Sequence, residues 1–258
     1  MNLLKKKLIE NQPLAGTHIS LSEPCISELI GGLGYDFIWI DTEHTAIDYH
    51  MLEMLLIGAR AGGVNAIVRI PWNDPVLAKR VLEMGPDGIV FPMVNTAEEA
   101  DRAMKCCMYP PEGNRGFGPI RAARYGLEDM DQFIQRNNHE LCRFIQIETV
   151  TAVENLPEIV KNPYIDGYFF GPCDLSGSIG ELNRVFDHNT TELIERSVAI
   201  LQEAGKPIGI STGSNDPDVL KYWYNKGIRI ISSCGDFTYI LNGARDNLSQ
   251  LRKILGRD

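Results

Sequence analysis

Eight short apolar segments recur along this chain, and their repetition limits the folds that it can adopt. The segments are four to six residues long, rich in Ile, Val and Phe, and bounded by Gly, Pro or Asp. This pattern is typical of strands that are buried on both faces of a sheet. The predicted strands span residues 16–21, 37–41, 66–70, 88–92, 144–148, 168–171, 207–211 and 228–232.

Amphipathic stretches lie between these segments, and several begin with Asp-Pro, Thr or Asn and end at Gly. The predicted helices span residues 48–61, 75–84, 96–107, 152–161, 190–204 and 217–226. Strict alternation of strand and helix implies a parallel sheet covered by helices. Eight such units predict an α/β fold with one domain, a TIM-type (β/α)8 barrel over residues 1–258. An open doubly wound sheet is less favoured, because no G-x-G-x-x-G follows the first strand.

Charge and cysteine content exclude several kinds of partner. A net charge of −9 argues against nucleic acid, which proteins bind through clustered Lys and Arg. The one dense basic run, Lys5-Lys6-Lys7, is interpreted as a solvated helix end, and a small anionic substrate stays compatible. No run of 18 apolar residues predicts a membrane span. Six cysteines without a C-x-x-C pair predict reduced thiols in a cytoplasmic protein rather than a zinc motif or a disulfide framework.

One interval breaks the rhythm of the pattern. About fifty residues separate the fourth and fifth predicted strands, and residues 109–126 within it read YPPEGNRGFGPIRAARYG. Loops this long inside a compact domain are usually functional, and we expect this one at the catalytic end of the barrel. The tail, residues 241–258, has the apolar spacing of a terminal helix.

Polar residues gather where four predicted strands end. Barrel enzymes carry their reactive groups at the carboxyl ends of the strands, an edge called the mouth below. These side chains are therefore expected to meet there. The four strand ends are Asp41-Thr42-Glu43-His44, Val68-Arg69, Gln146-Ile147-Glu148 and Gly171-Pro172-Cys173-Asp174.

Glu148 and Asp174 are the candidate metal ligands. They lie 26 residues apart, one strand–helix unit, and neighbouring strands are ~4.8 Å apart, so both carboxylates can reach one cation. Two carboxylates without a thiolate or a second imidazole suit Mg²⁺ or Mn²⁺, with positions left for water and a chelating substrate. The alternative is that each carboxylate caps a helix or pairs with a lysine.

Two further side chains have a functional and a structural interpretation. Arg69 ends an apolar strand and needs a partner, either an ion pair with Glu43 or Glu83 or an oxyanion that it clamps. His44 is either a hydrogen-bonded core histidine or a general base. The backbone amides of Cys173 and Asp174 either receive a substrate carboxylate or simply form a tight turn.

Five stretches together resemble the HpcH/HpaI aldolases, the metal-dependent pyruvate aldolases typified by 4-hydroxy-2-oxoheptanedioate aldolase. They are GYDFIWIDTEH, VRIPWNDPVLAKRVLEMGPDGIVFPMVNTAEEA, YPPEGNRGFGP, QIET and DGYFFGPCDLSGSIG. The similarity runs from about residue 13 to 180 and more weakly to about 245. It implies a barrel of the phosphoenolpyruvate/pyruvate-binding type. It also implies cleavage of a 4-hydroxy-2-oxo acid into pyruvate, or a related 2-oxo acid, and an aldehyde, through a metal-stabilised enolate.

The resemblance also implies roles for individual residues. Glu148 and Asp174 would hold Mg²⁺, Mn²⁺ or Co²⁺. Arg69 would neutralise the enolate oxygen, and His44 would transfer a proton. Gln146 would contact the substrate. The family histidine is often paired with an aspartate that corresponds to Glu83 here, so Glu83 is predicted to assist His44.

Three further departures from the family pattern lie near the substrate or in the long loop. His18 stands where many relatives carry tryptophan, and Ser211 stands where relatives are usually apolar. The long loop carries Arg121 and Arg124, which are equally compatible with substrate binding and with subunit contact. Ser211 and the loop place a more polar, more cationic surface near the aldehyde side, so the acceptor substrate stays open, and Ser211 is included among the substrate-binding candidates.

Two other functions remain open at this point. Some relatives condense an acyl thioester with a 2-oxo acid, as a citrate synthase does, and the basic loop would suit a polycarboxylate. A barrel that only binds a small anion is the third possibility, although the set of His44, Arg69, Glu148 and Asp174 disfavours it. The resemblance further implies a homo-oligomer, a hexamer built as a trimer of dimers, with the C-terminal helix packed on a neighbouring subunit.

Overall fold

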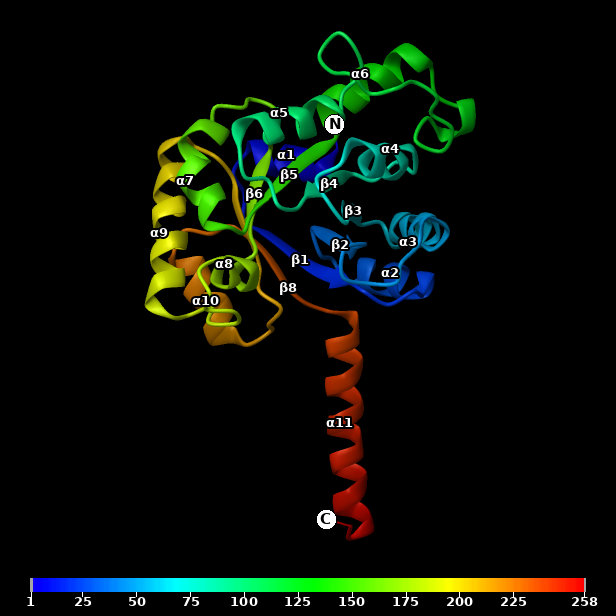
Figure 1. Ribbon diagram of the computed structural model, residues 1–258. Coiled ribbons are helices and arrows are strands. Elements are labelled where there is room, and N and C mark those ends of the chain that lie inside the picture. The colour runs from blue at the N-terminus through cyan, green and yellow to red at the C-terminus, as the bar shows by residue number, and fades with distance from the viewer. Residues whose placement is uncertain (1, 258) are drawn as a thin grey trace.

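Every strand of the sheet pairs in parallel with its neighbour in sequence, and the last strand pairs with the first, in a computed structural model that describes residues 2–257. The closed barrel confirms the TIM-type α/β fold and excludes the open doubly wound sheet (Figure 1). Met1 and Asp258, which the predicted domain includes, lie outside the described residues. The strands are β1 Leu14–Ile19, β2 Phe37–Asp41, β3 Asn65–Arg69, β4 Gly88–Phe91, β5 Cys142–Ile147, β6 Gly167–Phe170, β7 Ile208–Ser211 and β8 Ile230–Gly235.

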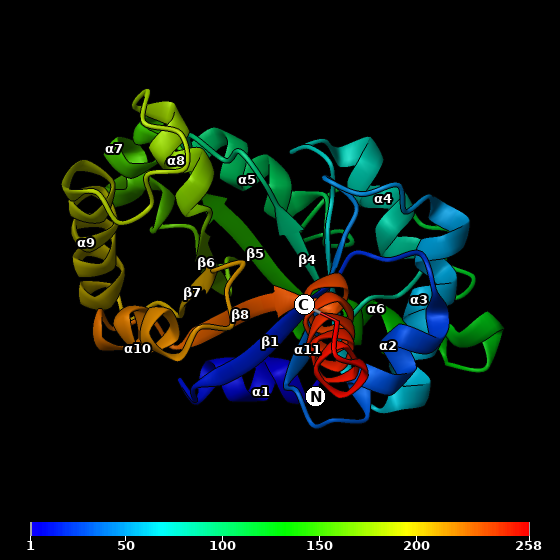
Figure 2. The same cartoon turned by 90° about the horizontal axis from the view of Figure 1, so that it is seen from below.

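Helices surround the barrel (Figure 2) and include the six predicted ones with shifts of one or two residues at their ends. Side chains such as Asp48, Asp74 and Thr149 accept hydrogen bonds from the first-turn amides and so fix where helices begin. The helices are α1 Leu3–Ile9, α2 Pro24–Gly31, α3 Tyr49–Gly62, α4 Pro75–Glu83, α5 Ala97–Lys105, η1 Arg124–Gly126, α6 Met130–Glu140, α7 Val150–Ile159, α8 Pro172–Ser178, α9 His188–Glu203, α10 Pro217–Asn225 and α11 Asp236–Leu255.

Large apolar side chains fill the inside of the barrel. Trp39, Phe144 and Phe169 are fully buried there and meet edge to face. Glycines make room for them, because a Cβ at Gly16 would lie 2.2 Å from the ring of Phe37. The interior is therefore a packed core, and substrate can reach the barrel only at its ends.

Helix α1 covers the amino end of the barrel, and of its three lysines only Lys6 is solvated as predicted. Leu4 and Leu8 belong to the interior cluster. Lys5 is buried and lies 2.5 Å from Asp166, and Lys7 pairs with Asp36. Their ammonium groups satisfy carboxylates that precede β6 and β2, so the basic run stabilises the closed end of the barrel.

The long loop lies at the opposite end from the one predicted. Helix α5 runs antiparallel to the strands, so residues 109–126 start at the amino end of the barrel, and they stay there. The backbone amide of Ala122 donates to Glu83 O at 3.1 Å, and Arg121 donates to Met84 O. Both carbonyls belong to the C-terminal end of α4. Within this chain, Arg121 and Arg124 are therefore remote from the mouth.

Helix α11 projects away from the barrel as a single rod (Figure 1). Asp236 anchors its start, because its carboxylate accepts hydrogen bonds from the amides of Ser20 and Leu21. Beyond it, several large apolar side chains are exposed, including Ile240, Leu248 and Leu251. No helix within residues 2–257 combines the length and the apolar character that crossing a membrane requires.

Candidate active site

The pleat of the strands places four polar side chains just above the apolar interior. Side chains alternate between the two faces of a strand, so residues two positions after an inward-facing one also face inward. Trp39, Ile67 and Phe144 face inward at the middle of the barrel. The inward-facing side chains that follow them at the mouth are Asp41, Arg69, Gln146 and Glu148.

Arg69 is the buried cation of this layer, with 9% of its surface exposed. Its Nε and Nη2 donate to the two carboxylate oxygens of Asp41 at 2.9 and 2.6 Å. Its Nη1 lies 3.0 Å from Glu43 Oε2 and donates to Gln146 Oε1 at 3.4 Å. The ion pair predicted for Arg69 is thus made with Glu43 and Asp41 and not with Glu83. The bidentate pair fixes the plane of the guanidinium.

Glu148 is a buried acid whose two oxygens already accept hydrogen bonds. It is 2% exposed, and Oε1 accepts from the amide of Met93 at 2.6 Å while Oε2 accepts from Gln146 Nε2 at 2.7 Å. Burial, together with the negative charges of Glu43 and Asp174, raises the pKa of Glu148 to about 7. The negative charge of the Glu148 carboxylate is therefore only partly balanced by Arg69, the cation that lowers its pKa.

The backbone around Glu148 is shaped to hold it. Met93 adopts φ 55, a left-handed conformation that is uncommon for a residue other than glycine, and this conformation directs its amide at the carboxylate. The side chain of Asn95 stabilises the loop that follows β4, since it donates to Met93 O at 3.1 Å and accepts from Thr149. Gly171 allows close approach, because a Cβ there would lie 2.6 Å from Glu148 Oε2.

Asp174 provides the second carboxylate, in the first turn of α8 directly after β6. Within residues 2–257 it forms no hydrogen bond or ion pair, and no lysine contacts Glu148. Its charge helps to raise the pKa of Glu148 and, after burial, that of Glu43, so the three acids are within electrostatic range. The residues therefore fit a hard divalent cation. The described part of the chain contains no group of three or more His, Cys, Asp or Glu side chains suited to a metal, so water or substrate would complete the coordination.

His44 and Glu83, predicted to act as a pair, lie at opposite ends of the barrel. His44 is exposed at the mouth, with Nε2 3.8 Å from Glu43 Oε2. Glu83 ends α4, which runs back along the barrel, and its Oε1 accepts from Arg115 at 2.9 Å. The predicted pairing is wrong within this chain, because the direction of α4 carries Glu83 to the amino end.

His18 and Ser211 form a hydrogen-bonded pair across the mouth. Ser211 Oγ lies 2.9 Å from His18 Nε2, and the imidazole packs against Trp39 with ring centroids 5.1 Å apart. Burial and the positive charge of Arg69 lower the pKa of His18 to about 4. The ring is therefore neutral at pH 7 and acts as a hydrogen-bonding group rather than a cation.

The neutral state of His18 predicts an acid-sensitive fold. In the unfolded chain the ring has a pKa of 6.5, so it takes up a proton more readily there than in the folded protein. The contribution of neutral His18 to the free energy of unfolding is therefore complete above pH 6.5 and is lost as the pH falls toward 4. Between pH 7 and pH 5, the free energy of unfolding of wild type should fall by about 1–2 kcal/mol more than that of His18→Gln. Partial exposure of the ring keeps this difference small, because solvent screens the charge. Urea unfolding of both proteins at each pH measures the difference, and parallel pH profiles would contradict it.

Two contributors to the site had no role assigned to them from the sequence. Asp41 orients Arg69. Its position at the Asp41–His44 strand end could have indicated this role, because that strand end faces the same mouth as Arg69. Met93 contributes only its backbone amide, through a conformation that its residue type does not favour. No sequence pattern reports such a contact.

Comparisons with known proteins agree with this architecture. The sequence profile of HpcH/HpaI aldolase/citrate lyase proteins matches residues 14–236. A hydroxypyruvate/pyruvate aldolase of Roseobacter denitrificans is 31% identical over 242 residues, which cover 94% of each chain.

Two solved structures superpose closely on this barrel. A HpcH/HpaI aldolase/citrate lyase family protein from Burkholderia cenocepacia has a TM-score of 0.92 and 28% identity, and the match covers 98% of this chain and 100% of the other. Citrate synthase SbnG has a TM-score of 0.84 and 25% identity, with 98% and 99% covered.

Proposed function

Because this chain belongs to the HpcH/HpaI aldolase/citrate lyase family and is a carbon–carbon lyase, we propose that it is a divalent-metal-dependent aldolase. Its proposed reaction cleaves a 4-hydroxy-2-oxo acid into pyruvate, or a related 2-oxo acid, and an aldehyde. The observation that carries the proposal is the pair of acids Glu148 and Asp174. They lie at neighbouring strand ends, and the charges of Asp174 and Arg69 both act on Glu148. A cytoplasmic location stays part of the proposal.

Glu148 and Asp174 would hold Mg²⁺, Mn²⁺ or Co²⁺. A bound divalent cation would supply Lewis-acid polarisation of the keto and carboxylate oxygens of a 2-oxo acid. The raised pKa of Glu148 supports this assignment, since a cation beside it would favour the ionised form. The first-turn amides of Cys173 and Asp174 have no preceding helical carbonyl to bond and are suited to the substrate carboxylate.

The chain's own residues would stabilise the charge that develops when the carbon–carbon bond breaks. Arg69 is held by Asp41, so its Nη1 edge is preorganised beside Gln146 and need not reorient during the reaction. Gln146 in turn donates to Glu148 and so links the guanidinium to the acid pair. His44, exposed at the mouth, is placed to take a proton from the 4-hydroxyl or to return one.

A metal titration tests this function. The protein should release pyruvate from 4-hydroxy-2-oxo acids with Mg²⁺, Mn²⁺ or Co²⁺, and EDTA should remove the activity until metal is restored. Unchanged turnover after thorough chelation would contradict the proposal.

A citrate-synthase-like condensation is the second candidate, favoured by the close superposition on citrate synthase SbnG. Thiol release from acetyl-CoA with oxaloacetate distinguishes the two reactions. An aldolase should give no thiol above the uncatalysed rate under conditions in which it releases pyruvate.

The His18–Ser211 pair predicts a polar acceptor aldehyde. The pair presents a neutral imidazole and a hydroxyl at the mouth, and a site with buried polar groups discriminates against analogues that leave them unpaired. The double variant His18→Trp/Ser211→Leu should shift the kcat/KM ratio of an apolar aldehyde to a hydroxyaldehyde by about 10–100-fold toward the apolar one. Aldol addition of pyruvate to propanal and to glycolaldehyde measures this ratio. An unchanged ratio would remove Ser211 from the substrate-binding set.

We also propose that α11 packs on a neighbouring subunit, because its apolar residues stay exposed among residues 2–257. Leu248, Leu251 and Ile254 repeat at helical spacing along the rod. The variant Leu248→Glu/Leu251→Glu should lower the molar mass measured by light scattering, whereas Ser249→Glu/Gln250→Glu on the other face should not. Equal masses for the two variants would contradict this packing.

A further inference from the structure

The amino end of the barrel contains a cavity that the aldolase chemistry does not use. It has a volume of ≈ 480 Å³ and lies between the end of α3, the turn before β4, the long loop and α6. It is at the opposite end from the mouth, since residues 85–87 precede β4 and Leu141 precedes β5. Leu82, Phe133 and Leu141 give it an apolar wall, so it can also accommodate an organic group.

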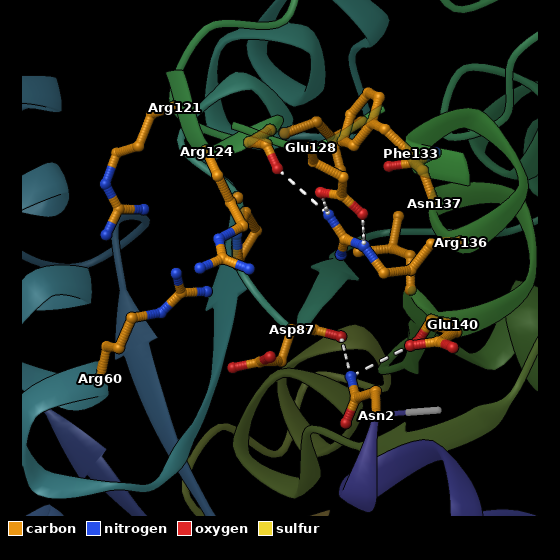
Figure 3. A pocket seen from close by; sticks show the side chains of 15 residues that line it. Asn2, Arg60, Asp87, Arg121, Arg124, Glu128, Phe133, Arg136, Asn137 and Glu140 are labelled. Carbon is orange, nitrogen blue, oxygen red and sulfur yellow. Dashed lines mark hydrogen bonds and ion pairs between the residues drawn. The ribbon is translucent and has the colours of Figure 1, made fainter. Parts of the chain in front are cut away.

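Three guanidinium groups share this cavity, and within residues 2–257 none of them forms a hydrogen bond with a carboxylate. Arg60, Arg121 and Arg124 turn toward the same space (Figure 3). Within residues 2–257, the side chains of Arg60 and Arg124 form no hydrogen bond or ion pair. Arg121 donates to Met84 O and reaches Glu53 only at 3.8 Å. Burial and the like charge of Arg60 lower the pKa of Arg121, so the cluster is electrostatically strained.

Of the acids that line the cavity, Glu128 pairs with Arg136 and Glu140 lies on the far side, while Asp87 acts on two of the three arginines only through its charge. Glu128 forms two hydrogen bonds of 2.7 Å with Arg136, so that pair is internally neutral. Asp87 accepts from the amide of Ala66 at 2.8 Å, and burial raises its pKa, but its negative charge also acts on Arg60 and Arg121 and offsets part of their positive charge. Glu140 lies beside Asn2, away from the three arginines (Figure 3).

The loop that carries the arginines is held in place. Arg124 and Tyr125 both adopt left-handed backbone conformations, φ 53 and φ 59, which cost free energy for residues other than glycine. Ala122 fixes the loop, since its amide donates to Glu83 O at 3.1 Å and its carbonyl accepts from Arg136 at 3.2 Å. The cavity is therefore preformed, and a ligand would not have to order it.

We propose that this cavity binds the phosphate group of a small phosphorylated molecule, with Arg60, Arg121 and Arg124 as its ligands. A carboxylate carries one charge and pairs with one guanidinium fork. A phosphate monoester carries up to two charges on three oxygens, so it can pair with guanidinium groups arriving from several directions. The apolar wall then contacts the organic part of the molecule.

Isothermal titration calorimetry tests the site on the full chain, with Mg²⁺ and saturating pyruvate present to fill the mouth. The probes are inorganic phosphate and glycerol phosphate, and succinate at equal ionic strength is the carboxylate comparison. Both phosphate probes should bind, and succinate should bind at least about tenfold more weakly. Succinate binding as tightly as phosphate, or no phosphate binding up to millimolar concentration, would overturn the proposal.

Matched variants locate the binding. Arg60→Gln and Arg124→Gln remove exposed guanidinium groups that form no hydrogen bond or ion pair within residues 2–257, so both proteins should keep the wild-type melting temperature. Each should weaken phosphate binding by about tenfold or more, because a charge-assisted hydrogen-bonding group is lost. Arg184→Gln, an exposed arginine outside the cavity, is the control and should bind like wild type. Equal affinity in all three variants would place the phosphate elsewhere and refute the site.

Discussion

Replacing Glu148 by glutamine should reduce kcat/KM for aldol cleavage by roughly a thousandfold or more, while the barrel stays folded. The substitution preserves shape, and the amide of Met93 can still donate to the glutamine carbonyl. It removes one of the two anionic groups proposed to hold the cation, which contributes several kcal/mol to transition-state stabilisation. Steady-state kinetics over a series of metal concentrations measures the loss.

Stability measurements separate this role from a structural one. In the metal-free protein, the buried carboxylate of Glu148 is unfavourable, as its raised pKa indicates, so Glu148→Gln should melt at the same or a higher temperature. Added Mn²⁺ should raise the melting temperature of wild type but not of Glu148→Gln, because a ligand stabilises only a state that binds it. The exposed Glu154→Gln is the matched control and should behave like wild type. A Glu148→Gln protein that still responds to Mn²⁺ would show that the cation is held elsewhere.

Replacing Arg69 by lysine should lower kcat by roughly 10²–10³-fold, the loss typical of a removed oxyanion-stabilising group. Lysine keeps the charge but has one ammonium group, which cannot donate to both oxygens of Asp41 and also face Gln146. The KM for the 2-oxo acid should change much less than kcat, since the proposed interaction strengthens only as negative charge develops. A kcat within threefold of wild type would contradict the role of Arg69.

The choice of lysine matters, because Arg69→Ala mixes two effects. Removing the guanidinium leaves Asp41 buried without its partner, and breaking a buried ion pair in this way typically costs about 3–5 kcal/mol. Loss of activity in Arg69→Ala would then reflect unfolding as much as chemistry. The double variant Asp41→Asn/Arg69→Met removes both charges, and we expect it to recover stability without recovering activity.

The strand ends were the most informative part of the sequence. Parallel strands all end at one edge, so once the apolar segments were recognised, Arg69, Gln146 and Glu148 could be assigned to one mouth. Their inward direction follows from the two-residue repeat of the strand, counted from Ile67 and Phe144. The metal itself remains a proposal, because coordination depends on the approach of two carboxylates rather than on their spacing in the chain.

Two predicted placements do not hold within this chain, and the geometric reason is the same. Helices α4 and α5 return along the outside of the barrel, so they carry Glu83 and the long loop to the amino end. Spacing along a helix does not reveal which end of the barrel the following residues occupy. The arginine cavity arises from this return path, because it brings Arg121 and Arg124 to the end of α3 and to Arg60.

Sequence patterns alone were enough to predict the eight-stranded barrel, the family, and the acids and arginine at the strand ends. These depend on local periodicity, strand direction and long matching stretches. Four features are visible only in the folded chain: Asp41 orients Arg69, a left-handed Met93 holds Glu148, His18 is hydrogen-bonded to Ser211, and three arginines line one cavity at the amino end of the barrel. These contacts join residues far apart in the chain, and their distances depend on how strands close and helices return, which no local pattern encodes.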